Sequence, residues 1–256
     1  MKEKKVISAT IVLYNEDINE LSKTIDSFLN TSISKKLFLV DNSPTDHLKI
    51  VANHPDIEYI FNEKNVGFGA GHNRIINSIK NTSTYHLILN PDVTFDTKVI
   101  PNLIQEIEKQ NDVAMIAPKV IFPNGEHQYT CRRYPTFFEL TVRRISLLKN
   151  VFSTRIRKGE YKDKDLTKPF YPDFVQGCFM LFRTVAFVQI NGFDESYFLY
   201  MEDVDICRKI DGINKQKMYY PNEEVVHVLK KGSSKKGTLF FRHLSSSLKY
   251  FRKWSS

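Results

Sequence analysis

A chain of 256 residues, 41% hydrophobic and 26% charged, is long enough for one large or two small globular domains. No run of eighteen apolar residues occurs, which argues against a transmembrane helix, and residues 1–5 do not lead into a secretion-signal core. The three cysteines are widely spaced without a CxxC pair, so we expect no disulfide framework, no thiolate zinc site and a reducing cytoplasm.

Strand-like and helix-like segments alternate through the first half of the chain. A continuous β-branched and apolar run at residues 6–14 predicts a buried strand, and apolar residues at helical spacing predict a helix over 17–29. Further strands are predicted at 36–41, 57–61, 85–89 and 113–117, with helices over about 70–80 and 98–110. This alternation predicts an α/β fold with a parallel, doubly wound sheet, whose ligand edge carries the polar residues that follow its strands.

The regular alternation stops at about residue 118. A turn is predicted at 122–125, a strand over 174–182, and a short helix capped by Thr184. No internal repeat or low-complexity linker interrupts the chain. We therefore predict one domain over residues 1–236, followed by a basic helix over 237–256.

Three carboxylates lie among apolar residues at 200–207, where solvation alone would not place them. Burying an unpaired charge costs several kcal/mol, so Glu202, Asp203 and Asp205 are either paired or used in chemistry. The structural alternative is a helix N-terminus whose acidic residues complement the dipole, with Asp205 pairing Arg208 or Lys209 on the surface. This segment alone leaves both interpretations open.

The glycine-rich sequence GFGAGHN at residues 67–73 has a superficial likeness to a dinucleotide-binding loop. His72 occupies the position of the third glycine, and the segment follows the third predicted strand rather than the first, which argues against a dehydrogenase. Glycines that open a helix can still let a ligand approach the backbone, and a tight turn is the structural alternative.

Asn90-Pro91-Asp92 places a carboxylate at a predicted strand end. One or two protein carboxylates are enough to hold Mg2+ against a diphosphate, although a turn cap would explain a single aspartate equally well. His227 lies in an apolar, strand-like run, which is typical of a core histidine. The lysines that follow it, Lys230 and Lys231, would suit a diphosphate and favour a site.

The C-terminal part of the chain is strongly basic. Residues 225–256 contain eight Lys or Arg and no Asp or Glu, which equals the net charge of +8 for the whole chain. A helix there would place on one arc the apolar residues Phe240, Phe241, Leu244, Leu248, Phe251 and Trp254. Such a helix is typical of an anionic membrane surface, the alternative being a helix docked on the core. No pattern indicates nucleic-acid binding.

Six short motifs in order resemble family 2 glycosyltransferases with the GT-A fold. They are TIVLYNE at 10–16, VDNS at 40–43, NVGFGAGHN at 65–73, LNPD at 89–92, NGFDE at 191–195 and YMEDVDIC at 200–207. The resemblance covers about residues 6–235. It implies a Rossmann-like, mostly parallel doubly wound sheet with helices on both faces. The versions at 67–73 and 89–92 are most similar to bacterial rhamnosyltransferases of O-antigen or other surface polysaccharide assembly.

The resemblance also implies roles for individual residues. A half over about 1–118 would bind the nucleotide sugar, and a half over about 119–236 the acceptor. Contacts to the nucleotide sugar would come from Tyr14, Asn15, Glu16, Asp41, Gly69, Asn73, Asn90, Lys230 and Lys231. Asp203 would be the general base beside Glu202, and Asp92 with His227 would bind Mg2+ or Mn2+, with Asn90 in place of the first DXD aspartate.

The expected function is inverting transfer of a sugar, with L-rhamnose from dTDP-rhamnose as the first choice. The acceptor would be a saccharide or polyprenyl-diphosphate-linked hydroxyl at the cytoplasmic face of the inner membrane. Its lipid-diphosphate would contact the basic residues Arg143, Arg144, Lys149, Arg155, Arg157 and Lys158. A UDP donor carrying galactofuranose or a hexose stays open, as do a non-catalytic sugar-nucleotide-binding partner and a basic membrane adaptor.

Overall fold

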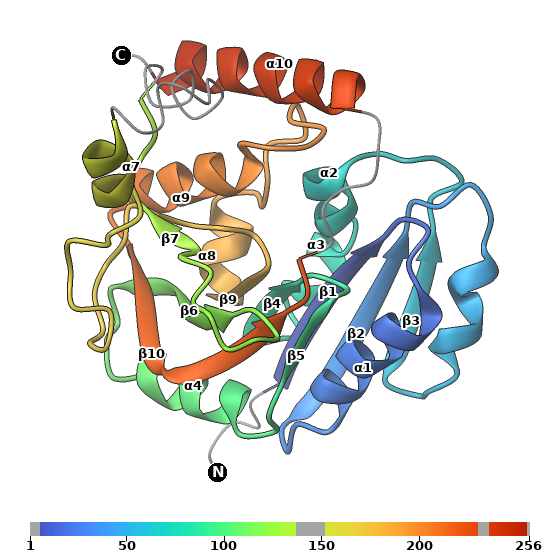
Figure 1. The fold of residues 1–256 in the computed structure, drawn as a ribbon. Helices are drawn as coiled ribbons and strands as arrows, with labels where there is room; N and C mark the ends of the chain where they lie inside the picture. The colour runs from blue at the N-terminus through green and yellow to red at the C-terminus, as the bar shows by residue number, and fades with distance from the viewer. Residues whose placement is uncertain (1–5, 137–151, 230–235, 255–256) are drawn as a thin grey trace.

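An eight-stranded sheet forms the centre of the fold, and helices lie against both of its faces (Figure 1). The computed structural model describes residues 6–136, 152–229 and 236–254. The strands of the sheet are β1 (Val6–Leu13), β2 (Ser34–Asp41), β3 (Ile57–Phe61), β4 (Tyr85–Leu89), β5 (Val93–Phe95), β6 (Val113–Ile121), β9 (Phe179–Arg183) and β10 (Gln216–His227). A two-stranded sheet pairs β7 (Cys131–Arg132) with β8 (Phe174–Val175).

The described helices follow the strands in the alternation that the sequence predicts. They are α1 (Ile18–Leu29), the 3-10 helix η1 (His47–Ala52), α2 (Phe68–Asn73), α3 (Ile76–Ile79), α4 (Val99–Ile107), α7 (Ser153–Gly159), α8 (Thr184–Gln189), α9 (Glu202–Gly212) and α10 (Lys236–Trp254). The helix predicted over about 70–80 is divided into α2 and α3, because residues 74 and 75 interrupt the helical hydrogen bonding.

The sheet is mixed, and its order is β3-β2-β1-β4-β9-β6-β10-β5. Parallel pairs join β1 to β2 and β4, β2 to β3, and β6 to β10, so the predicted α/β class is confirmed. Strand β9 runs antiparallel to β4 and β6, and β5 runs antiparallel to β10. The strand predicted over 174–182 is wrong as one unit, because residues 176–178 separate β8 from β9 and carry them into different sheets.

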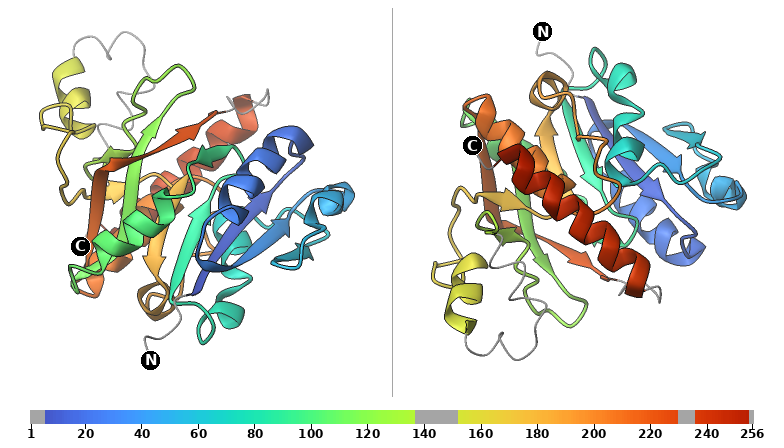
Figure 2. Two further views of the ribbon diagram at one scale, coloured as in Figure 1. Left: turned by 90° about the horizontal axis from the view of Figure 1, so that it is seen from below. Right: turned by 90° about the horizontal axis from the view of Figure 1, so that it is seen from above.

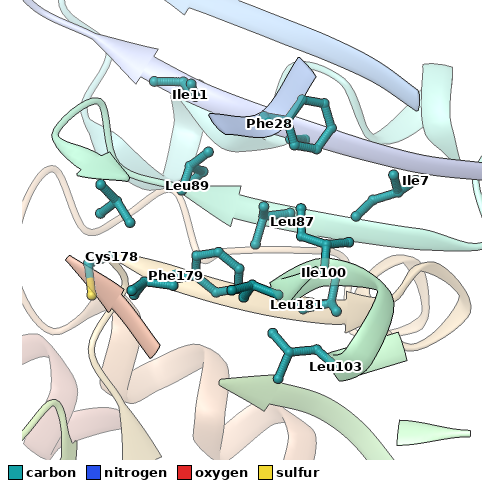
Figure 3. Packing of buried hydrophobic residues seen from close by; sticks show 14 of the residues in the cluster. Ile7, Ile11, Phe28, Leu87, Leu89, Ile100, Leu103, Cys178, Phe179 and Leu181 are labelled. Carbon is teal, nitrogen blue, oxygen red and sulfur yellow. The ribbon is translucent and has the colours of Figure 1, made fainter. Parts of the chain in front are cut away.

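Two apolar cores lie on opposite faces of the sheet. Along β4, Leu87 and Leu89 belong to one core and Ile88 to the other, as the alternation of side chains in a strand requires. The first core packs α1 and α4 onto the sheet, with Phe28 and Ile100 among its side chains (Figure 3). The second packs residues of α3, α8, α9 and α10 against the other face.

Helix α10 packs on α9 and on the loop that precedes it (Figures 1 and 2). Trp254 Nε1 donates to Asp205 Oδ1 at 2.7 Å, and Ser246 Oγ donates to Leu199 O at 2.9 Å. Lys253 Nζ lies 2.8 Å from the same Asp205 oxygen. The surface pairing expected for Asp205 is therefore wrong, because its side chain is fully buried and is satisfied by α10.

The docked face of α10 differs from the predicted apolar arc. Trp254 contacts the core together with buried Ser246, Ser247 and Tyr250. Three other members of the arc point outward: Phe241, Leu244 and Leu248 are 68%, 39% and 54% exposed. Across the described ranges, no helix combines the length and apolar character that a membrane span requires.

Candidate active site

A cavity of about 450 Å³ opens where β1 and β4 end and where β9 begins. Its lining residues are Val12, Glu16, Phe68, Asn90, Pro91, Asp92, Gln176, Gly177, Cys178, Leu199, Tyr200, Glu202, Asp203, His227 and Leu229. The cavity therefore unites residues from the ends of several strands with the first turn of α9. This is the edge at which α/β folds bind ligands.

The pairing of β5 with β10 brings Asp92 and His227 together. His227 stands opposite Val93 in the antiparallel register, and Val228 N donates to Asp92 O at 3.0 Å. His227 Nε2 lies 3.2 Å from Asp92 Oδ1, and both side chains are nearly buried. Burial alone lowers the pKa of His227, but hydrogen bonds to Asp92 and Cys178 outweigh it and raise the pKa to about 10.

Two further oxygens of the cavity have no protein partner. Asn90 Oδ1 and Glu202 Oε2 are buried and make no hydrogen bond within the described part of the chain. Unpaired buried polar atoms are uncommon in folded proteins, and their presence at a cavity wall indicates a place for a ligand. Asn90 lines the same cavity as Asp92 and His227, and these three side chains provide oxygen and nitrogen donors beside a space large enough for a diphosphate.

This donor set fits a divalent cation that is shared with a ligand. Among the described residues, no three His, Cys, Asp or Glu side chains gather closely enough to enclose a metal on their own. Mg2+ usually takes one or two protein carboxylates and completes its shell with phosphate oxygens and water. Asp92 and His227 meet that requirement only together with a phosphate-bearing ligand.

Glu202 and Asp203 occupy the first turn of α9, and both line the cavity. Val204 N donates to Asp203 Oδ1 at 2.9 Å, and Gly177 lies beside this side chain, where an added Cβ would be 3.8 Å from the Asp203 Cβ. Burial raises the pKa of both carboxyls, and the charge of Asp203 raises the pKa of Glu202 further. The hydrogen bond from Val204 N favours the ionised form of Asp203, whereas Glu202 Oε2 has no such partner among the described residues.

The backbone before α9 is strained. Tyr200 and Met201 both adopt positive φ, 69° and 70°, which non-glycine residues rarely do. Two such residues in succession persist only where the surroundings enforce them, and they cluster at functional sites. Here they turn the chain so that Leu199 and Tyr200 form one wall of the cavity and Asp203 another.

The residues predicted to hold the nucleoside lie at the ends of β1 and β2. Glu16 lines the cavity, Tyr14 is half exposed, and Asn15 N donates to Ser43 Oγ at 2.9 Å. Asp41 is fully buried, with its oxygens accepting from Ser43 N at 2.7 Å and from the Tyr59 hydroxyl at 2.5 Å. In this arrangement Asp41 holds the turn after β2 and is not open to the cavity.

The structure does not bring Gly69 and Asn73 to the cavity lining. A Cβ on Gly69 would lie 2.8 Å from the Phe193 Cβ, so the missing side chain permits close packing. Asn73 hydrogen bonds through both side-chain atoms to the backbone of Phe193, at 2.9 Å each. These residues join α2 to the segment before α9, while Phe68 of the same motif lines the cavity.

The basic residues predicted to contact the nucleotide sugar or the acceptor fall into two groups. Lys230, Lys231, Arg143, Arg144 and Lys149 lie outside the described residues. Arg155, Arg157 and Lys158 are exposed on α7 and are absent from the cavity lining. Their assignment to the acceptor stays a prediction.

Several site residues were missed in the sequence. Gln128 accepts at 2.9 Å from His227 Nδ1, and Gly177 lines the cavity next to Asp203. Leu199 and Tyr200 form a wall that the motif at 200–207 only partly indicated. No local signal identifies Gln128, because its partner is 99 residues away.

Comparison with known proteins gives one family and a consistent set of relatives. A family model described as glycosyl transferase family 2 matches residues 8–187. The rhamnosyltransferase WbbL of Escherichia coli K12 is 27% identical over 226 residues, covering 84% of this chain and 81% of its own. An N-acetylglucosaminyl-diphospho-decaprenol L-rhamnosyltransferase of Mycobacterium tuberculosis is 25% identical over 213 residues, covering 78% and 68%.

The fold is also shared with a solved structure of low sequence identity. The crystal structure of GalNAc-T7 with UDP, GalNAc and Mn2+ aligns with a TM-score of 0.67 at 17% identity. The alignment covers 90% of this chain and 45% of that one, so this chain spans less than half the length of GalNAc-T7 in that structure. The GT-A fold expected from the sequence is confirmed.

Proposed function

The chain belongs to glycosyl transferase family 2 and is a glycosyltransferase, and from this premise we propose that its cavity carries out an inverting transfer with Asp203 as general base. The observation that carries the proposal is the carboxyl pair of α9. Asp203 accepts from Val204 N at the cavity wall, which favours its ionised form, whereas Glu202 Oε2 is buried with no partner among the described residues, which favours its neutral form. Environments that separate two neighbouring carboxyls in this way assign the base and the neutral partner.

The chemistry follows from the weak nucleophilicity of a hydroxyl group near neutral pH. Asp203 takes the proton of the acceptor hydroxyl while the hydroxyl oxygen attacks the anomeric carbon of the donor sugar. The bond between that carbon and the nucleoside diphosphate breaks in the same step. A positioned base contributes roughly 10²–10⁴ in rate. A single displacement inverts the anomeric centre.

For the donor, we propose L-rhamnose carried by dTDP, because two curated relatives are named rhamnosyltransferases. A UDP donor with galactofuranose or a hexose is the alternative. Thermal-shift screening against nucleotide sugars, with and without Mn2+, tests this. A ligand at a hundredfold excess over its Kd adds about 2.7 kcal/mol of stability, so the true donor should stand out.

For the acceptor, we propose a hydroxyl of a saccharide or of a polyprenyl-diphosphate-linked sugar in cell-surface polysaccharide synthesis, such as O-antigen and lipopolysaccharide assembly. The name of the mycobacterial relative describes a lipid-diphosphate substrate of this kind. Transfer of a labelled sugar to synthetic acceptors, with and without the lipid diphosphate, distinguishes the two possibilities.

We also propose that Asp92 and His227 hold Mg2+ or Mn2+ against the diphosphate, where the cation offsets charge on the leaving group. The aspartate–histidine geometry and the unpaired oxygen of Asn90 support this. Replacing Asp92 with asparagine should weaken Mn2+ binding in the presence of UDP by about 10- to 100-fold, because one anionic ligand is lost. Titration calorimetry measures the change.

The matched control for that variant is Asp96→Asn, which alters an exposed aspartate four residues further along the chain. It should leave Mn2+ binding unchanged. Removing the metal with EDTA should lower sugar transfer in the unmodified enzyme, and added Mn2+ or Mg2+ should restore it. Full activity after EDTA treatment would contradict the metal proposal.

The outward face of α10 leads us to propose a peripheral position on the cytoplasmic face of the inner membrane. Phe241, Leu244 and Leu248 are exposed on a helix that contains no Asp or Glu. Exposed apolar side chains among cations suit an anionic lipid surface. A second copy of the chain fits less well, because self-association through this face would place like charges together.

Replacing Phe241, Leu244 and Leu248 with serine should weaken binding to anionic phospholipid vesicles by roughly tenfold or more, since apolar burial supplies part of the affinity. Co-sedimentation with vesicles of anionic and of neutral lipid measures it. The control replaces Ile50 and Val185, which are 71% and 73% exposed elsewhere, with serine. Equal vesicle binding by the two variants would exclude this face of α10 as the membrane contact.

A further inference from the structure

We propose that Gln128 is a positioning residue that fixes the ring of His227 so that Nε2, and not Nδ1, is the nitrogen beside Asp92 that would bind the cation. This inference rests on the metal site proposed above and extends it to a residue that is absent from the cavity lining. Gln128 lies in the segment between β6 and β7, and His227 ends β10. The two side chains meet although they are 99 residues apart.

The hydrogen bonds of the Gln128 amide define its orientation. Its Nε2 donates to the backbone oxygen of His227 at 2.6 Å and to that of Ile121 at 3.3 Å. Backbone carbonyl oxygens only accept, so the amide nitrogen must face them. The amide oxygen Oε1 is therefore the atom that lies 2.9 Å from His227 Nδ1.

This orientation determines the tautomer of the imidazole. Oε1 can only accept, so Nδ1 must carry a hydrogen and donate it. Nε2 is then the nitrogen that can give up its hydrogen to bind a cation, and it lies 3.2 Å from Asp92 Oδ1. A neutral histidine binds a metal through the nitrogen that has no hydrogen, and a partner on the other nitrogen holds the ring in that state.

The backbone of Gln128 is fixed as well. Its N–H donates to Val120 O at 2.9 Å, which ties the segment to the end of β6. The backbone of Gln128 is therefore held in place, and its side chain hydrogen bonds to both the ring and the backbone carbonyl of His227. The ring orientation that places Nε2 at the proposed metal site therefore depends on the side chain of Gln128.

The experiment compares Gln128→Met and Gln128→Asn with the unmodified protein. Methionine keeps the length but removes all three side-chain hydrogen bonds, and asparagine is one methylene too short to reach Nδ1. Both should raise the Kd for Mn2+ in the presence of UDP by about 10- to 100-fold. The control Gln110→Met changes a glutamine near the opposite end of the sheet and should leave this Kd unchanged.

A second measurement separates positioning from general stability. With 15N-labelled histidine and Cd2+ as a diamagnetic substitute, NMR should show the metal on Nε2 of His227 in the unmodified protein. In the Gln128 variants, Cd2+ should no longer bind His227 through Nε2 alone. Circular dichroism and the Tm show whether these variants are folded. A His227→Gln variant assigns the signal.

Equal Mn2+ affinity in the unmodified protein and a folded Gln128 variant would overturn the proposal. So would metal binding through Nδ1, or an unmodified protein that binds no Mn2+ with UDP. A sugar-transfer assay on the same variants separates this proposal from the proposed reaction. If the unmodified protein transfers sugar but the Gln128 variants bind Mn2+ as tightly as it does, only the role of Gln128 is rejected. If Mn2+ binding depends on Gln128 but the unmodified protein transfers no sugar, only the proposed reaction is rejected.

Discussion

Replacing Asp203 with asparagine is expected to lower the rate of sugar transfer by about 10²–10⁴-fold, the contribution of a positioned base. Asparagine preserves the size of the side chain and its oxygen can still accept from Val204 N, so the cavity should keep its shape. Nucleotide binding should therefore be nearly unchanged. Initial transfer rates and calorimetric titration with the donor nucleotide measure the two quantities separately.

Glu202→Gln is the matched control for this variant. Glu202 retains its proton because burial and the charge of Asp203 raise its pKa, so a neutral amide is a close substitute. Its effect on the rate should be much smaller. Substantial turnover by Asp203→Asn would remove Asp203 from the role of base.

The same assignment predicts the direction of the pH dependence. A base acts when it is deprotonated, so transfer should fall as the pH decreases through the pKa of Asp203. Burial raises that pKa, which places the acid limb above the ordinary aspartate value of about 3.9.

Replacing Asp205 with alanine should lower the free energy of unfolding by about 2–3 kcal/mol, because hydrogen bonds to a buried charge are lost. Trp254 Nε1 would lose its acceptor, and Lys253 would keep only Asp194. For a chain of this size the change corresponds to a Tm lower by roughly 4–12 °C. Activity should also fall, since α10 supports Leu199 at the cavity wall.

Asp194→Ala is the control, because Asp194 binds the same Lys253 but not Trp254. The Asp194–Lys253 pair is partly exposed, so its loss should lower the free energy of unfolding by less than about 1 kcal/mol. Equal Tm values for the two variants would contradict the anchoring role of Asp205. Deleting residues after 237 also removes Lys253 and Trp254, so loss of activity in that truncation would not identify the helix as the functional element.

Periodicity was sufficient to predict the elements with strong local signals. Apolar runs located β1, β2, β3 and β4, of which β3 is only partly buried, and helical spacing located α1 and α4. Strand β5 is only three residues long and exists because it pairs with β10, so no local pattern could indicate it. The division between β8 and β9 likewise depends on the cavity and on contacts with β4 and β7, which are distant in sequence.

The motif residues that line the cavity lie at the end of a strand or at the start of a helix, as Asp92, Asp203 and His227 do. The glycines of residues 67–71 illustrate what a sequence cannot decide. A missing side chain can admit a ligand or a neighbouring segment, and here Gly67 and Gly69 admit residues 193–198. Gln128 carried no signal, because its importance arises only from its distance to His227.

The reversed direction of β9 changes the polarity of the backbone at the catalytic edge. Parallel strands present their carboxyl ends there, and unpaired carbonyl groups would repel an anionic base. Because β9 begins at this edge, residues 176–178 enter it there; the N–H groups of Gln176 and Cys178 donate to the carbonyl oxygens of Thr130 and Gln176, and Gly177 lies beside Asp203. The reversed strand thus brings backbone N–H groups, in place of carbonyl oxygens, next to the carboxyl proposed as the base, and together with the charge of Arg132 they favour its ionised form.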